Sequence, residues 1–323
     1  MTVVFIHFND CLKSKKVPIV NKLLKIYSVI TTIGMFVILL MGAIVTSTDS
    51  GDGCGNSWPL CYGKLLPPQP ELETIIEYSH RIVSGLLGIM VIILAVWTWK
   101  KLSHIRETKA LAFLSVFLIV FQGLLGAAAV IWGQSSAVLA LHFGISLLSV
   151  AAVFLLTVLV FEADRYGQEF VVKIDSKFRT TLYAFFVFLY IVIYSGAFVR
   201  HTQASLACSS WPFCNANEWL PPLNSIEGIH FVHRILAFFL VIWLFYLFIK
   251  ARKTTRIDTN FQVVSKSLLY SFILILLQVA SGALVVFTKL NLFITLAHGF
   301  FISCLFVIIT YLLLLASRQH LIR

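Results

Sequence analysis

The second apolar stretch of the chain, Ile75–Trp99, reads IIEYSHRIVSGLLGIMVIILAVWTW and decides the fold. It is long enough to cross a bilayer as a helix, which takes about 20 predominantly apolar residues. Its first turns nevertheless contain Glu77, His80 and Arg81. Ionisable groups at membrane depth are rare and usually functional. The stretch therefore predicts a membrane-spanning helix with chemically active groups near one end.

The rest of the chain has the same character. Of its 323 residues, 59% are hydrophobic and only 12% are charged, too few charges to cover the surface of a soluble globular protein. We expect an all-α integral membrane protein with eight transmembrane helices in the lipid bilayer. The predicted segments are Ile26–Thr46, Ile75–Trp99, Ala110–Trp132, Val138–Phe161, Leu182–Val199, Ile229–Ile249, Leu268–Phe287 and Leu292–Ala316.

The basic residues predict the orientation of these helices. Twenty of the 25 Lys and Arg residues lie in the N-terminal tail (1–25), the C-terminus (318–323) and the loops after the second, fourth and sixth segments. Because cytoplasmic loops carry an excess of Lys and Arg, both termini are expected in the cytoplasm, at the plasma membrane. The net charge of +11 is then a topology signal rather than a sign of nucleic-acid binding.

The chain also contains an internal repeat, with matching residues 153 to 156 positions apart. The matches pair Cys54 with Cys208, Trp58-Pro59 with Trp211-Pro212, His80-Arg81 with His233-Arg234, Gln122 with Gln278, Gly126 with Gly282 and His142 with His298. The repeat predicts two tandem four-helix bundles in the same orientation, a parallel pseudo-repeat. The halves are 26–165 and 182–317, joined by a cytoplasmic linker, 166–181.

Four histidines lie at similar depth in the even-numbered helices: His80, His142, His233 and His298. Each is four to six residues from the expected outer end of its helix, a depth of about 6–9 Å at 1.5 Å per residue. Two facing imidazoles in each bundle predict a haem site near the outer face. The alternative is four interfacial histidines bonded to neighbouring carbonyls or water.

Other polar residues near these histidines have two interpretations each. Arg81 and Arg234 either reach the lipid headgroups or pair with haem propionates. Glu77 is either a helix-terminus carboxylate or a catalytic group. His230 takes its position in the second half, so one half is expected to do chemistry while the other holds a cofactor. His201 and His230 themselves are expected to be solvated near the outer surface, and the alternative is that they assist a site.

Two cysteine pairs lie in the outer loops, Cys54 with Cys61 and Cys208 with Cys214. Their spacing differs from that of zinc sites, so we expect two disulfides in an oxidising compartment. Both disulfides are expected to stabilise their loops, and a redox role is an alternative for Cys54–Cys61.

Taken together, these motifs resemble bacterial haem A synthases of the Bacillus type, over about residues 23 to 318. The residues that carry the resemblance are Gly51-Asp-Gly-Cys-Gly with Trp-Pro-Leu-Cys61, Glu77-Tyr-Ser-His-Arg81, Ala140-Leu-His-Phe-Gly144, Gly196-Ala-Phe-Val-Arg-His201, Leu206-Ala-Cys208, His233-Arg234 and Ala297-His298.

The resemblance implies that a ring methyl of haem O is oxidised to a formyl group by two successive hydroxylations. It assigns Glu77 as the catalytic carboxylate, His80 and His142 as residues flanking the substrate haem, and His233 and His298 as ligands of a resident haem b. A haem O synthase (protohaem farnesyltransferase) is an expected partner, and the electron acceptor is not identified. The competing interpretations are a dihaem cytochrome b that oxidises quinol, a membrane thiol oxidase and a haem transporter.

Overall fold

The structure is a computed structural model that describes residues 20–318 except 66, 68–69, 134, 167, 216–219 and 258. Its eight long helices are α2 (Lys22–Ser47), α3 (Leu72–Leu102), α4 (Thr108–Ile131), α5 (Ser136–Tyr166), α6 (Ser176–His201), α7 (Ile226–Thr255), α8 (Gln262–Phe287) and α9 (Leu292–Ser317). Short 3-10 turns are η1 (Ser50–Asp52), η2 (Ala204–Leu206) and η3 (Thr259–Phe261). All eight helices are long and apolar enough to cross a membrane, so the predicted multi-pass, all-α class is confirmed.

Most of the helices extend beyond the apolar segments that predicted them, and polar side chains cap the first turns of α2, α6, α7 and α9. Asp175 accepts hydrogen bonds from the backbone N–H of Lys177 and Phe178, so α6 begins at Ser176 rather than at Leu182. Residues 176–181 of the expected linker therefore belong to a helix. Apolar length reports the thickness of the bilayer, whereas caps set the helix ends.

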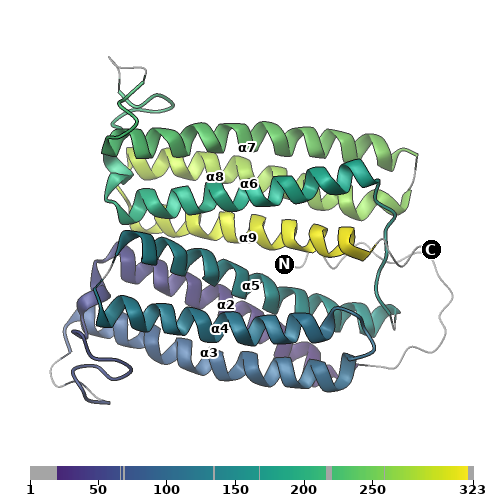
Figure 1. Ribbon diagram of the computed structural model, residues 1–323, viewed down its shortest axis with the longest axis horizontal. Helices are drawn as coiled ribbons and strands as arrows, with labels where there is room; N and C mark the ends of the chain where they lie inside the picture. Colours follow the sequence, from purple (N-terminus) through teal and green to yellow (C-terminus); the bar gives the residue numbers. More distant parts are fainter. Residues whose placement is uncertain are drawn as a thin grey trace.

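Helices α2 to α5 form one four-helix bundle and α6 to α9 form a second, as Figure 1 shows. In each bundle the four helices contact one another in a ring, and the first and last helices are also neighbours. The halves meet where α2 and α5 face α6 and α9. The tandem arrangement predicted from the repeat is thus the observed one.

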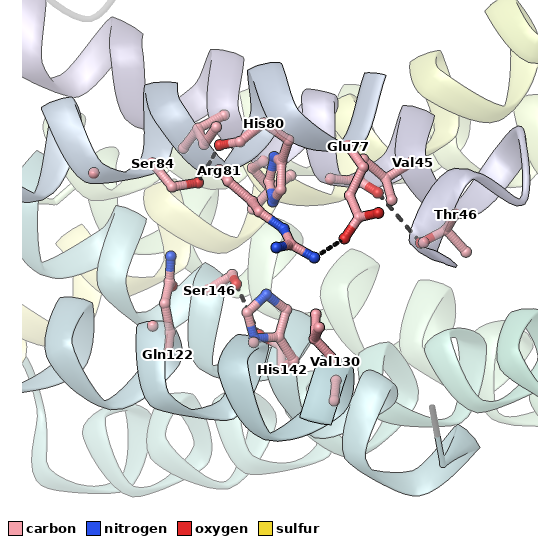
Figure 2. Close-up of a pocket in the computed structure, with 18 of the residues that line it drawn as sticks. Val45, Thr46, Glu77, His80, Arg81, Ser84, Gln122, Val130, His142 and Ser146 are labelled. Atoms are coloured by element: carbon pink, nitrogen blue, oxygen red, sulfur yellow. Dashed lines mark hydrogen bonds and ion pairs between the residues drawn. The ribbon is translucent and has the colours of Figure 1, made fainter. Parts of the chain in front are cut away.

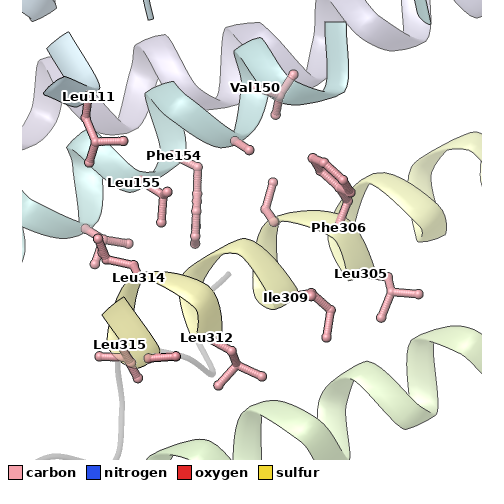
Figure 3. Close-up of a cluster of buried hydrophobic side chains, with 14 of the residues drawn as sticks. Leu111, Val150, Phe154, Leu155, Leu305, Phe306, Ile309, Leu312, Leu314 and Leu315 are labelled. Carbon is pink, nitrogen blue, oxygen red and sulfur yellow. The ribbon is translucent and has the colours of Figure 1, made fainter. Parts of the chain in front are cut away.

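Helices α5 and α9 lie at the centre of the molecule. In their most apolar 18-residue windows, 78% of the residues of α5 and 56% of those of α9 are buried, against 22–33% for the other six helices. Phe154 of α5 and Phe306 of α9 belong to this shared core, shown in Figure 3. The peripheral helices expose the apolar side chains that would face lipid.

A buried ion cluster joins the end of α9 to the first bundle. Arg318 is 0% exposed and pairs with Glu107 at 3.1 Å and with Glu162 at 2.8 Å. Burial lowers the pKa of Arg318, but the two carboxylates outweigh this effect and raise the pKa above its ordinary value. Arg318, the first residue of the predicted C-terminal segment, is buried because two acidic side chains of the first half pair with it.

Candidate functional site

A cavity of about 970 Å³ lies inside the first bundle, between α2, α3, α4 and α5. Glu77, His80 and Arg81 of α3, Gln122 of α4 and His142 of α5 line it. Figure 2 shows the rings of His80 and His142 directed toward one another across this space, with the Glu77–Arg81 pair beside them. The volume is at the upper end of the range for ligand sites, about 300–1,000 Å³.

Glycines on the neighbouring helices bring the backbone close to both rings. A Cβ placed on Gly42 of α2 would lie 3.3 Å from Cε1 of His80, and one on Gly126 of α4 would lie 3.4 Å from Cε1 of His142. Among the described residues, neither buried Nδ1 atom has a hydrogen-bond partner. His80 lies eight residues after the first residue of α3, and His142 lies six residues after the first residue of α5. Both are somewhat deeper than predicted, because these helices start earlier than expected.

Glu77 connects the cavity to the first cysteine loop. Its side chain is buried, at 4% exposure, and its Oε2 accepts a hydrogen bond of 2.7 Å from the backbone N–H of Cys54. Its Oε1 pairs with the guanidinium of Arg81. Arg81 also donates to the carbonyls of Ser57 and Leu60, at 2.6 and 3.1 Å. The carboxylate therefore has a fixed orientation at the edge of the cavity.

The matching arginine of the second bundle makes matching contacts with its own loop. Arg234 donates through Nη1 to the carbonyls of Ser210, Pro212 and Phe213, at 2.6, 3.3 and 3.0 Å. The loops are closed by both predicted disulfides, Cys54–Cys61 and Cys208–Cys214. Each arginine thus anchors a disulfide loop, a contact that neither of the two sequence-based interpretations includes.

In the second bundle, His233 and His298 have serine partners that the sequence analysis missed. Nδ1 of His233 lies 2.9 Å from Oγ of Ser195, and Nδ1 of His298 lies 3.0 Å from Oγ of Ser281. Each serine directly precedes a glycine, and this Ser-Gly pair in α6 and in α8 is the signal that was available. Nε2 of His298 also lies 3.0 Å from the amide nitrogen of Gln278.

The two remaining histidines near this end of the molecule are not both solvated. His230, which takes the position of Glu77, is buried at 6% exposure, and its Nδ1 has no partner within the described part of the chain. His201 is half-buried and lines the cavity of the first bundle. It does so because the end of α6 reaches across to α2, where Arg200 donates to the carbonyl of Thr46 at 2.8 Å.

The arrangement suits a flat macrocycle with an iron at its centre. In each bundle, two imidazoles from different helices lie at one level, and haem iron takes such imidazoles as axial ligands. The Nδ1 atoms of His80 and His142 have no side-chain partner among the described residues, and His233 contacts Ser195 through its Nδ1. In three of the four rings, hydrogen bonds to side chains therefore leave at least one nitrogen for a metal. The residues that line the cavity of the first bundle therefore fit a haem, and the second bundle offers the matching pair of imidazoles, His233 and His298.

Comparisons with known proteins agree with this chemistry. The family model COX15-CtaA, described as cytochrome oxidase assembly protein, matches residues 25–310. A protein of Geobacillus kaustophilus named Heme A synthase is 51% identical over 297 residues, which cover 92% of each chain. Proteins with the same name are 48% identical in Halalkalibacterium halodurans (93% of this chain, 99% of that one) and in Bacillus licheniformis (93% and 98%). The chain belongs to the COX15-CtaA family of cytochrome oxidase assembly proteins.

Proposed function

We propose that the protein is a haem A synthase that oxidises a ring methyl of haem O to a formyl group, for haem A-containing terminal oxidases. The observation that carries this proposal is the cavity of about 970 Å³ between His80 and His142, with Glu77 at its edge, in a chain of this family. Family membership favours haem A synthesis over a dihaem electron carrier, a thiol oxidase or a transporter.

The substrate haem O lies in the first bundle, flanked by His80 and His142. Each of two hydroxylations of the same methyl carbon adds the oxygen of a water molecule and releases two protons and two electrons, which pass to an external electron acceptor. The resulting geminal diol loses water and leaves the formyl group. Glu77, held by Arg81 and by the Cys54 amide, stabilises positive charge that develops near that carbon or orients water toward it. Because its partners fix the carboxylate beforehand, little reorganisation is needed during the reaction.

A haem b resides in the second bundle, where His233 and His298 hold it. When bound, this group supplies an iron that accepts and passes on electrons. Arg81 and Arg234 are already engaged with loop carbonyls, and Nη2 of Arg234 is buried without a partner among the described residues. Arg234 therefore has one group of N–H donors left for a haem propionate, in addition to its loop contacts.

The test of the catalytic assignment is Glu77→Gln in the full-length protein, expressed with a haem O source. We expect bound haem b to stay at the wild-type level and haem A to disappear, as measured by mass analysis of the extracted porphyrins. Glu73→Gln is the matched control, because Glu73 lies one turn earlier on α3 and is exposed. Full conversion by Glu77→Gln would rule out the role.

Alanine variants of the four histidines test the division of labour. His233→Ala and His298→Ala are expected to lose the resident haem b. His80→Ala and His142→Ala are expected to keep it while product falls. His104→Ala, in an exposed position between α3 and α4, is the control. Unchanged haem content in both second-bundle variants would remove the haem b assignment.

The distribution of basic residues and the position of the disulfide loops support cytoplasmic termini with both haem sites near the outer face. A cysteine at Lys289 should then react with a membrane-impermeant maleimide in intact cells. A cysteine at Lys101 should react only after lysis. Both residues are exposed, and a background with Cys11 and Cys304 replaced by serine avoids other labelling. The reverse pattern would invert the topology.

The insolubility of haem O supports direct transfer from a haem O synthase. What tests it is haem O loading at equal haem O content, with the synthase present or with free haem O added to membranes. Equal loading in the two cases would argue against a handover.

A further inference from the structure

The second bundle fixes which ring nitrogen of its histidines carries the proton. The hydroxyl of Ser195 donates to the carbonyl of Val192 at 2.7 Å, so its oxygen is left to accept from Nδ1–H of His233. Ser281 donates in the same way to the carbonyl of Gln278, at 2.9 Å, and accepts from Nδ1–H of His298. The Nε2 lone pair of His233 is then available for a metal, whereas that of His298 faces the side-chain amide of Gln278.

A second contact supports this assignment for His298. Its Nε2 lies 3.0 Å from the amide nitrogen of Gln278, and an amide nitrogen is only a donor. Nε2 therefore acts as the acceptor, and the proton belongs on Nδ1. With the amide of Gln278 in this orientation, the serine contact and the glutamine contact agree on one tautomer.

The first bundle lacks these serines. Gly42 matches Gly196 and Gly126 matches Gly282, so the residues before them, Met41 and Leu125, stand where the second bundle has Ser195 and Ser281. Methionine and leucine side chains cannot accept the Nδ1 proton in this way. The buried Nδ1 atoms of His80 and His142 accordingly have no side-chain partner among the residues that the structure describes, and the ring of His142 has only the backbone of Gln122 beside it.

We propose that Ser195 and Ser281 are positioning residues that make the second bundle the permanent haem site, and that their absence leaves the first bundle with an exchangeable one. This inference rests on the proposed function, which places a resident haem b in the second bundle and substrate in the first. An Nδ1–H donated to an oxygen fixes the orientation of the ring and makes Nε2 a more basic ligand. A substrate site needs the opposite property, because haem A must leave after each turnover.

Loss of such a partner typically weakens metal binding by about 10- to 100-fold. Purified Ser195→Ala and Ser281→Ala proteins should therefore retain less haem b during dialysis against apomyoglobin, with a dissociation rate raised by a similar factor. The midpoint potential of the remaining haem should rise, because a less basic imidazole stabilises the ferric iron less. Ser195→Thr, which keeps a hydroxyl, should restore both properties.

Ser271→Ala is the matched control, since Ser271 is buried in α8 about 15 Å along the helix from Ser281, at 1.5 Å per residue. A purely structural role for the serines would lower stability without moving the potential. Unchanged dissociation and potential in both alanine variants, with wild-type protein fully loaded, would overturn the inference. A wild-type protein without any haem b would instead remove the proposed function.

The reciprocal change tests the asymmetry directly. Met41→Ser combined with Leu125→Ser should give the first bundle the missing acceptors. The purified double variant is expected to retain a second equivalent of haem through the same dialysis. If the retained haem stays at the wild-type level while the variant remains folded, the serines are not what distinguishes the two bundles.

Discussion

At the scale of single residues, Glu77 and Arg81 form an ion pair, and the burial of the carboxylate makes it dependent on this partner. The carboxylate is 4% exposed, so its charge depends on the guanidinium beside it. The sequence identified Glu77 as a candidate catalytic group, because an acidic residue inside an apolar helix is rare. The sequence did not predict that Arg81 donates hydrogen bonds to loop carbonyls. Such contacts join a side chain to a distant part of the backbone and leave no pattern in the sequence.

Arg81→Gln should destabilise the protein more than Arg234→Gln. Both changes remove hydrogen bonds to a loop, but only the first leaves a buried carboxylate without its partner, at a cost of about 3–5 kcal/mol. Thermal unfolding in detergent, followed by circular dichroism, measures the difference. The double variant Glu77→Gln, Arg81→Gln should recover part of the loss, and equal midpoints for the two single variants would contradict this account.

At the scale of helices, the histidines depend on close approach by a neighbouring helix. A Cβ on Gly196 of α6 would lie 2.8 Å from Cε1 of His233, and one on Gly282 of α8 would lie 3.1 Å from Cε1 of His298. Small residues allow such approach between membrane helices. The matched glycines were visible in the sequence, but the ring that each one contacts was not, because that requires the rotation of both helices.

Gly196→Ala is expected to displace the ring of His233 and to reduce the haem b bound per protein, measured by absorbance of the pyridine haemochrome. Gly299→Ala is the control, because a Cβ there would meet nothing within 4 Å. Haem content equal to wild type in Gly196→Ala would show that the ring can move without loss of binding.

Each disulfide loop is held by a helix that also carries a histidine, through Arg81 of α3 in the first bundle and Arg234 of α7 in the second. Replacing Cys54 and Cys61 by serine should leave the haem b spectrum intact, because His233 and His298 lie in the other bundle. Product formation should fall, since the loop that supplies the Cys54 amide to Glu77 is no longer closed. Replacing Cys208 and Cys214 is the matched comparison, and a lost spectrum in the first variant would contradict the prediction.

At the scale of the whole molecule, the repeat predicted two bundles but not the way they meet. In a membrane protein, side chains that face lipid and those that face another helix are both apolar, so composition does not separate them. The central position of α5 and α9 therefore emerged only from the structure. The same holds for Arg318, whose partners Glu107 and Glu162 lie far away in the sequence.

Arg318→Leu should lower the stability of the assembled protein by about 3–5 kcal/mol, because the buried Glu162 loses its cation and the partly exposed Glu107 loses the same partner. The measurement is the midpoint of thermal unfolding in detergent. Lys289→Leu, at an exposed position beyond α8, is the control for loss of one positive charge. An unchanged midpoint in Arg318→Leu would show that the cluster does not hold the halves together.

The hydrogen bond from the Cys54 amide to Glu77 also imposes an order on biogenesis. The Cys54–Cys61 disulfide closes the loop that presents this amide. If Glu77 and the second bundle act as proposed, a newly inserted chain with reduced thiols would be able to bind haem b before its carboxylate has a fixed partner. Oxidation of the two thiols would then be a maturation step on which product formation depends and haem b binding does not.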